Sequence, residues 1–89
     1  MIADDVRPRL AAKVHLRADR ASGGTLLLYP EAGLALNPTA AAVVHLLDGE
    51  HTVAAIVDEL SARYGRREAV AHDVAAFLGT LADRGLLAR

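Results

Sequence analysis

The spacing of hydrophobic residues changes along the chain, from every second position to every third or fourth. Apolar and polar residues alternate over 13–17, with Val14 and Leu16 on one side, which indicates a half-buried strand with a solvated face. The unbroken apolar run Leu26–Tyr29 is too short for a helix and predicts a second strand, covered on both faces. The alternation in Leu34–Leu36 predicts a third strand.

Turn-forming residues limit these strands. Pro30 lacks the N–H that a sheet needs and has a φ suited to a turn, so strand pairing is expected to stop there. Gly33 is expected to supply the positive φ of a hairpin loop of about three to five residues. After the third strand, Asn37 is a favoured N-cap and Pro38 a favoured first helical residue, so a helix is predicted to begin there.

Three amphipathic helices are predicted in the second half of the chain, because apolar residues recur there at intervals of three and four. Thr52 is a typical N-cap, and Gly65 and Gly85 follow the last periodic residues, as helix-ending glycines do. The predicted ranges are Thr39–Leu47, Val53–Tyr64 and Glu68–Arg84, with Leu86 and Leu87 folding back over the core. Residues 1–12 show no such period and are predicted to be a flexible N-terminal arm.

The order of three short strands followed by three helices, joined by short connections, predicts one α+β domain over residues 13–89. It matches a winged helix-turn-helix whose wing lies at the N-terminal end. A three-helix bundle with a loose N-terminal arm is the competing architecture. The length of 89 residues allows one modest hydrophobic core and no second domain.

Composition excludes several classes of function. The chain has no cysteine, which removes disulfides, thiolate nucleophiles and the usual structural zinc sites. It has no apolar run long enough for a bilayer and no signal-peptide pattern, so we expect a cytoplasmic protein without a membrane partner. The net charge is −1 and the densest basic group is Arg63, Arg66 and Arg67, which argues against nucleic acid as the partner.

Candidate catalytic and metal-binding residues are sparse. The four histidines include no pair at the i, i+4 spacing of a helical metal site. Ser22 and Ser61 lack the context of a nucleophile elbow, and the Gly23–Gly24 pair does not precede a helix as a phosphate loop would. We therefore expect a protein that is not an enzyme and that needs no metal and no cofactor.

Short motifs follow one another in order along nearly the whole chain. They are Arg7-Pro8-Arg9-Leu10, Leu27-Leu28-Tyr29-Pro30-Glu31, Leu36-Asn37 with Ala40, Leu47-Asp48-Gly49, Thr52-Val53 with Ile56 and Leu60, Asp73-Val74 with Phe77-Leu78, and Gly85-Leu86-Leu87. In this order and spacing they resemble the PqqD family, pyrroloquinoline-quinone (PQQ) biosynthesis protein D, and the wider class of precursor-peptide recognition domains (RiPP recognition elements). The resemblance implies a non-catalytic winged helix-turn-helix that binds the leader segment of a ribosomally made precursor peptide and presents it to a radical-SAM enzyme.

The resemblance also implies where the leader lies: as an added strand against the third strand, in a groove walled by the third helix. If the third strand is a sheet edge, its unpaired N–H and C=O groups are available to an extended peptide. The residues expected to form this surface are Leu34, Ala35, Leu36, Val70, Asp73, Val74, Phe77 and Leu81. Asp73 is suited to pair with a basic leader residue. Core roles for Leu34, Leu36 and Phe77, and a merely solvated role for Asp73, stay open alternatives.

Two other functions fit the same pattern. The first is a DNA-binding winged-helix regulator that uses Arg63, Arg66 and Arg67, although it rests on fold analogy alone. The second is a dimerisation module in which the edge strand pairs with a second copy of itself. A monomer or a weak homodimer is the expected state.

Overall fold

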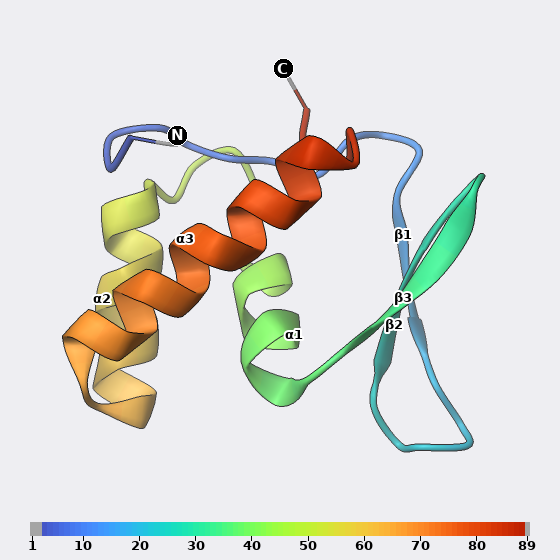
Figure 1. The fold of residues 1–89 in the computed structure, drawn as a ribbon, viewed down its shortest axis with the longest axis horizontal. Helices are drawn as coiled ribbons and strands as arrows, with labels where there is room; N and C mark the ends of the chain where they lie inside the picture. The colour runs from blue at the N-terminus through green and yellow to red at the C-terminus, as the bar shows by residue number, and fades with distance from the viewer. Residues whose placement is uncertain (1–2, 89) are drawn as a thin grey trace.

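The strands and helices follow one another in the order that the hydrophobic pattern predicts (Figure 1). The structure, a computed structural model, describes residues 3–88. The elements are β1 (His15–Ala18), β2 (Thr25–Tyr29), β3 (Ala32–Leu36), α1 (Pro38–His45), α2 (Val53–Tyr64) and α3 (Arg67–Asp83). The predicted α+β winged helix-turn-helix is confirmed, and the bundle without a sheet is wrong. The predicted bounds of α2 agree with the structure, and those of the other elements shift by a few residues.

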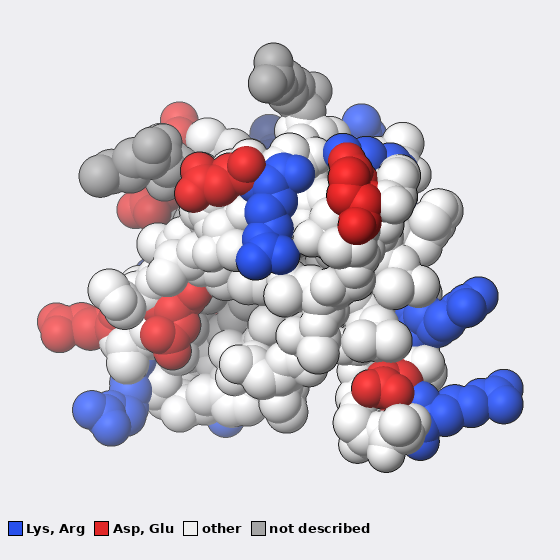
Figure 2. All heavy atoms as spheres, turned by 45° about the vertical axis from the view of Figure 1, so that its right-hand side comes forward, with Lys and Arg blue, Asp and Glu red and all other residues white. Residues whose placement is uncertain are grey.

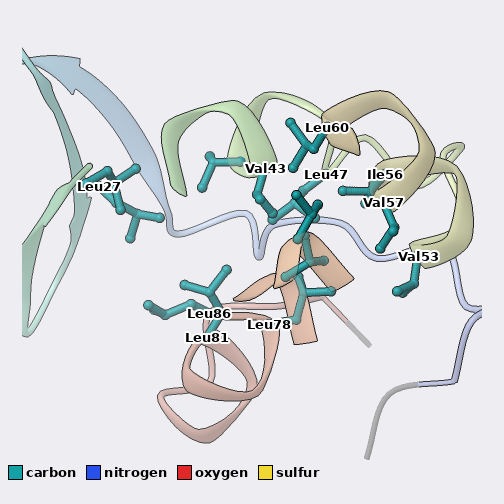
Figure 3. Close-up of a cluster of buried hydrophobic side chains, with 14 of the residues drawn as sticks. Leu27, Val43, Leu47, Val53, Ile56, Val57, Leu60, Leu78, Leu81 and Leu86 are labelled. Carbon is teal, nitrogen blue, oxygen red and sulfur yellow. The ribbon is translucent and has the colours of Figure 1, made fainter. Parts of the chain in front are cut away.

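The sheet is antiparallel with the order β1-β2-β3, so β2 is central and β1 and β3 are its edges. Leu27 of β2 lies opposite Leu16 and Leu34, which places these three side chains on one face. Leu27 is fully buried and points from the sheet toward the helices (Figure 3). Leu26 and Leu28 lie on the other face and stay partly exposed. The prediction that both faces of this strand are covered is therefore wrong.

The turn between β2 and β3 contains only Pro30 and Glu31, because Tyr29 pairs directly with Ala32. The expectation of a hairpin loop of about three to five residues is therefore wrong. Gly33 lies inside β3 and does not have the positive φ that was expected of it. A Cβ at Gly33 would stand 3.1 Å from Cδ2 of Leu28, so glycine here makes room for that leucine instead of shaping a turn.

Both predicted helix caps are present. Oδ1 of Asn37 accepts a hydrogen bond from the backbone N–H of Ala40 at 2.7 Å at the start of α1. Oγ1 of Thr52 accepts one from Ala55 N–H at 3.0 Å at the start of α2. Each cap satisfies a donor that has no partner within its own helix.

The core lies between the sheet and the apolar faces of the three helices (Figure 3). Its fully buried larger side chains are Leu27, Val43, Ile56, Leu60, Val74, Leu78, Leu81 and Leu86. After α3, Gly85 adopts a φ of 71° and Leu86 N–H donates to the carbonyl of Leu81 at 2.9 Å. The predicted return of Leu86 over the core is thus confirmed, and Leu87 beside it is half-buried.

The N-terminal segment crosses the top of the molecule in Figure 1, from the start of α2 to β1. Its carbonyls accept hydrogen bonds from the helical body: Val6 O from Val53 N–H at 2.9 Å and Pro8 O from Gly49 N–H at 3.1 Å. On its other side, Arg9 O accepts from Ala88 N–H at 2.7 Å. The sequence suggests a flexible arm here, whereas the structure attaches residues 6–9 to the rest of the molecule through these hydrogen bonds. The spacing of hydrophobic residues cannot predict such bonds, because it carries no information about the partners of backbone carbonyls. Residues 1 and 2 of that arm lie outside the described residues.

Candidate functional site

The outer edge of β3 carries backbone groups that no other strand in residues 3–88 uses. Pro30 has no N–H and the loop has two residues, so Tyr29 and Ala32 form the closing pair that exchanges both hydrogen bonds. Bonded and outward-facing residues alternate along an antiparallel edge. Gly33 and Ala35 therefore turn their N–H and C=O groups away from β2, into an open row.

The side chains of β3 divide between the two faces of the sheet. Leu34 and Leu36 share the face of Leu27, and Leu34 is half-buried while Leu36 is 8% exposed. Leu36 is thus a core residue, and Leu34 keeps some surface beside the open row. The small, exposed side chain of Ala35 lies on the opposite face.

A hollow of about 310 Å³ lies next to the end of β3, between the first turns of α1 and the middle of α3. Its lining residues are Asn37, Thr39, Ala40, Val43, Asp73, Ala76 and Phe77. Figure 2, which turns the sheet toward the viewer, shows uncharged surface across the middle of this face and charged side chains mainly toward its rim. The hollow combines apolar side chains, the uncharged polar side chains of Asn37 and Thr39, and a single carboxylate, that of Asp73.

Of the α3 residues expected at the site, Asp73 and Phe77 line this hollow. Val70, Val74 and Leu81 do not: they are 7%, 0% and 0% exposed and belong to the core. They lie on the face of α3 that packs into the core, so little or none of their side-chain surface is exposed. The hollow also contains residues that the sequence analysis did not assign to the binding surface, namely Asn37, Thr39, Ala40, Val43 and Ala76. The Asn37 cap, directly after β3, is the signal that places the start of α1 here.

An exposed stripe of α3 continues from the hollow. Asp73, Phe77, Thr80 and Arg84 are spaced at i, i+4, i+7 and i+11, which puts them on one side of the helix. Nη1 of Arg84 donates to the hydroxyl of Tyr29 at 3.1 Å, and Tyr29 pairs with Ala32. Arg84 thus marks the start of β3, and Asp73 marks its end. We call this stripe, the hollow and β3 together the β3–α3 surface.

The other candidate groups offer less. Arg67 forms an exposed ion pair with Asp58, and this carboxylate partly offsets the positive charge of the basic group that a DNA-binding function would use. No set of three His, Asp or Glu side chains within residues 3–88 is arranged to hold a metal ion. None of the helices in that part of the chain is both long enough and apolar enough to cross a bilayer.

The fold and the surface define a small winged helix-turn-helix domain with a free strand edge that ends at a hollow between α1 and α3. The family model of coenzyme PQQ synthesis protein D (PqqD) matches residues 24–87, and the chain belongs to this family, as the sequence motifs predict. This chain is 37% identical over 87 residues to the PqqA binding protein of Rhodopseudomonas palustris (strain TIE-1), and the match covers 97% of this chain and 85% of that protein. It is 48% identical over 59 residues to the PqqA binding protein of Stutzerimonas stutzeri (strain A1501), covering 66% of this chain and 64% of that relative.

Solved structures agree with this assignment. The solution structure of the PqqD part of Methylobacterium extorquens PqqCD, described as a functional, stand-alone RiPP recognition element, superposes with a TM-score of 0.84 at 34% identity. That match covers 100% of this chain and 96% of the other. Lasso peptide synthetase B1, solved in complex with a leader peptide, gives a TM-score of 0.78 at 26% identity. That match covers 93% of this chain and 99% of the synthetase chain.

Proposed function

We propose that this protein is a non-catalytic adaptor. It binds the leader segment of a ribosomally made precursor peptide of the PqqA type and presents it to a radical-SAM modifying enzyme in the cytoplasm. The observation that carries the proposal is the open row of Gly33 and Ala35 on β3, next to the hollow. The names of the curated relatives and the leader complex of a structural neighbour support it.

The leader would bind by strand addition. Each hydrogen bond to Gly33 or Ala35 contributes about 0.5–1.5 kcal/mol net, and a well-buried apolar anchor contributes about 1.5–3 kcal/mol. Leu34 and Phe77 are half-buried and can be covered further by such an anchor. These gains together offset the ordering cost of a flexible segment, which is about 2–5 kcal/mol.

Binding in this way gives the adaptor a role without chemistry of its own. An extended leader held along β3 leaves the following part of the precursor free to enter an enzyme. When adaptor and enzyme associate, the held peptide reaches the enzyme at an effective concentration of about millimolar, as for other short linkers. The proposed contribution of the adaptor is therefore to hold the precursor peptide close to the enzyme.

The test is an NMR titration of the isotope-labelled chain with the synthetic PqqA peptide of Rhodopseudomonas palustris. We expect amide shifts over Ala32–Leu36 and around Asp73–Phe77. N-methylation of the peptide at one residue at a time should weaken binding up to about tenfold at alternate positions, because only every second N–H faces β3. Shifts confined to Arg63–Arg67, or an N-methyl scan without alternation, would contradict strand addition.

A matched pair of variants separates the two sheet edges. Ala35→Pro removes an outward N–H of β3 and should weaken peptide binding. Ala18→Pro makes the same change on β1, where the register also turns Ala18 outward, and should leave the affinity unchanged. Equal losses in the two variants would contradict a site at β3. Because an open edge can also pair with a second copy, light scattering over a range of concentrations accompanies the titration.

A further inference from the structure

The carboxylate of Asp73 stands without a partner at the hollow. It makes no hydrogen bond and no ion pair with another residue of the described chain. The lining around it contains the apolar side chains of Ala40, Val43, Ala76 and Phe77 and the uncharged polar side chains of Asn37 and Thr39. A carboxylate above an apolar wall suits a side chain that has a hydrocarbon stem and a cationic end.

We propose that this hollow receives a lysine or arginine side chain of the bound peptide. The methylene stem packs on Ala40 and Phe77, and the charged end meets the carboxylate of Asp73. This assigns a chemical class to one position of the leader and rests on the proposed function of the β3–α3 surface.

The position along the peptide follows from the two ends of the surface. From Asp73 to Arg84 the helix rises about 16 Å over eleven residues, and an extended segment of five residues spans about the same length. Asp73 shares the hollow with Asn37, the residue after β3, and Arg84 donates to Tyr29, which pairs with Ala32 at the start of β3. A guest segment along β3 would therefore extend from the hollow at Asp73 toward Arg84. The positive charge of Arg84 repels a basic residue of the peptide, whereas Asp73 attracts it. A peptide with a basic residue near one end is therefore favoured in the orientation that places this end at Asp73.

The start of α1 has an opposing influence. Its positive end adjoins the hollow and favours an anion, but that end carries only about half an elementary charge. One of its donors, Ala40 N–H, is already bonded to Oδ1 of Asn37 at 2.7 Å. An acidic guest side chain would also meet the full charge of Asp73 at the same opening. The balance therefore favours a cation.

The test replaces each residue of the Rhodopseudomonas palustris PqqA peptide in turn by lysine, norleucine and glutamate, and measures affinity at low and high salt. At one position lysine should bind about fivefold more tightly than norleucine at low salt, with a smaller ratio at high salt. Asp73→Asn should abolish this ratio, and Asp73→Lys should shift the preference to glutamate. Asp83→Asn, which removes an exposed α3 carboxylate outside the hollow, should leave it unchanged.

The outcomes separate this inference from the proposed function. If peptides bind and no position prefers lysine, or the preference survives Asp73→Asn, the inference is wrong and strand addition stands. If no peptide binds the wild-type chain, both are wrong. The readout compares peptides on the same protein variant, so a change in the stability of the variant cannot imitate the predicted result.

Discussion

At the turn between α1 and α2, the carboxylate of Asp48 binds three donors. Oδ1 accepts backbone N–H groups from Glu50 at 2.8 Å and from His51 at 2.9 Å, and Oδ2 lies 2.8 Å from Nδ1 of the His51 ring. These bonds, the His51 N–H first, lower the pKa of Asp48 from its ordinary 3.8 to about 2. The next residue, Gly49, has a φ of 78° and donates its N–H to Pro8, so the turn also holds the N-terminal segment.

The lowered pKa of Asp48 predicts how stability depends on pH. A carboxylate whose pKa is lower in the folded state stabilises the fold above its unfolded value, near 4, and loses this contribution as pH falls through about 2. Asp48→Asn removes the titrating group, so its melting temperature should fall less between pH 4 and pH 2 than that of the wild type. Thermal unfolding over this range checks it, with Asp83→Asn as the control. Parallel curves for Asp48→Asn and the wild type would contradict the prediction.

Among the elements, those with local end signals are predicted best. The bounds of α2 follow from the cap at Thr52 and from Gly65, whose φ is 68°. The start of α3 was less accurate, because Arg66 before it adopts a left-handed φ of 52° and gives no side-chain cap. The expected loop through Gly33 is wrong, and β3 begins at Ala32 instead. A two-residue turn and a longer loop after Pro30 would both be compatible with this sequence. Only the pairing of Tyr29 with Ala32 separates them.

Thr52 gives a direct test of a local end signal. Thr52→Ala removes the acceptor for Ala55 N–H and should lower the free energy of unfolding by about 1 kcal/mol, the usual cost of losing an N-cap. Thr80→Ala is the matched control, since its hydroxyl donates to Ala76 O inside α3 and caps no helix end. Urea unfolding of the three proteins measures both differences. Equal stabilities of Thr52→Ala and Thr80→Ala would contradict the role of the cap.

For the whole molecule, the sequence predicts the third strand, but that this strand is a sheet edge, and which side of α3 is exposed, follow only from the structure. The helical period places Val70, Val74 and Leu81 on one side of α3 and Asp73 beside them, with Phe77 at the border between the two. Both sides contain apolar residues, and only the packing shows that the first side is buried against the core. The contribution of α1 to the hollow depends on the same packing, because its first turn meets α3 only in the folded chain.

The docking of the N-terminal segment is a property of the whole molecule that hydrogen exchange can test. Val53 and Ala54 occupy the first two positions of α2, where a backbone N–H has no partner within the helix. In the structure they donate to the carbonyls of Val6 and Asp4, at 2.9 and 3.1 Å. If the segment is docked in solution, these two amides exchange slowly, and deletion of residues 1–8 makes their exchange fast.

The neighbouring amide of Ala55 provides the internal control, because it is bonded to Thr52 in the same turn and does not depend on the deleted residues. Its protection relative to that of the α3 centre should be the same in both proteins. If the segment is instead the flexible arm that its sequence suggests, Val53 and Ala54 exchange equally fast with and without it. The hydrogen bonds of Val6 and Asp4 would then be too short-lived to protect the start of α2.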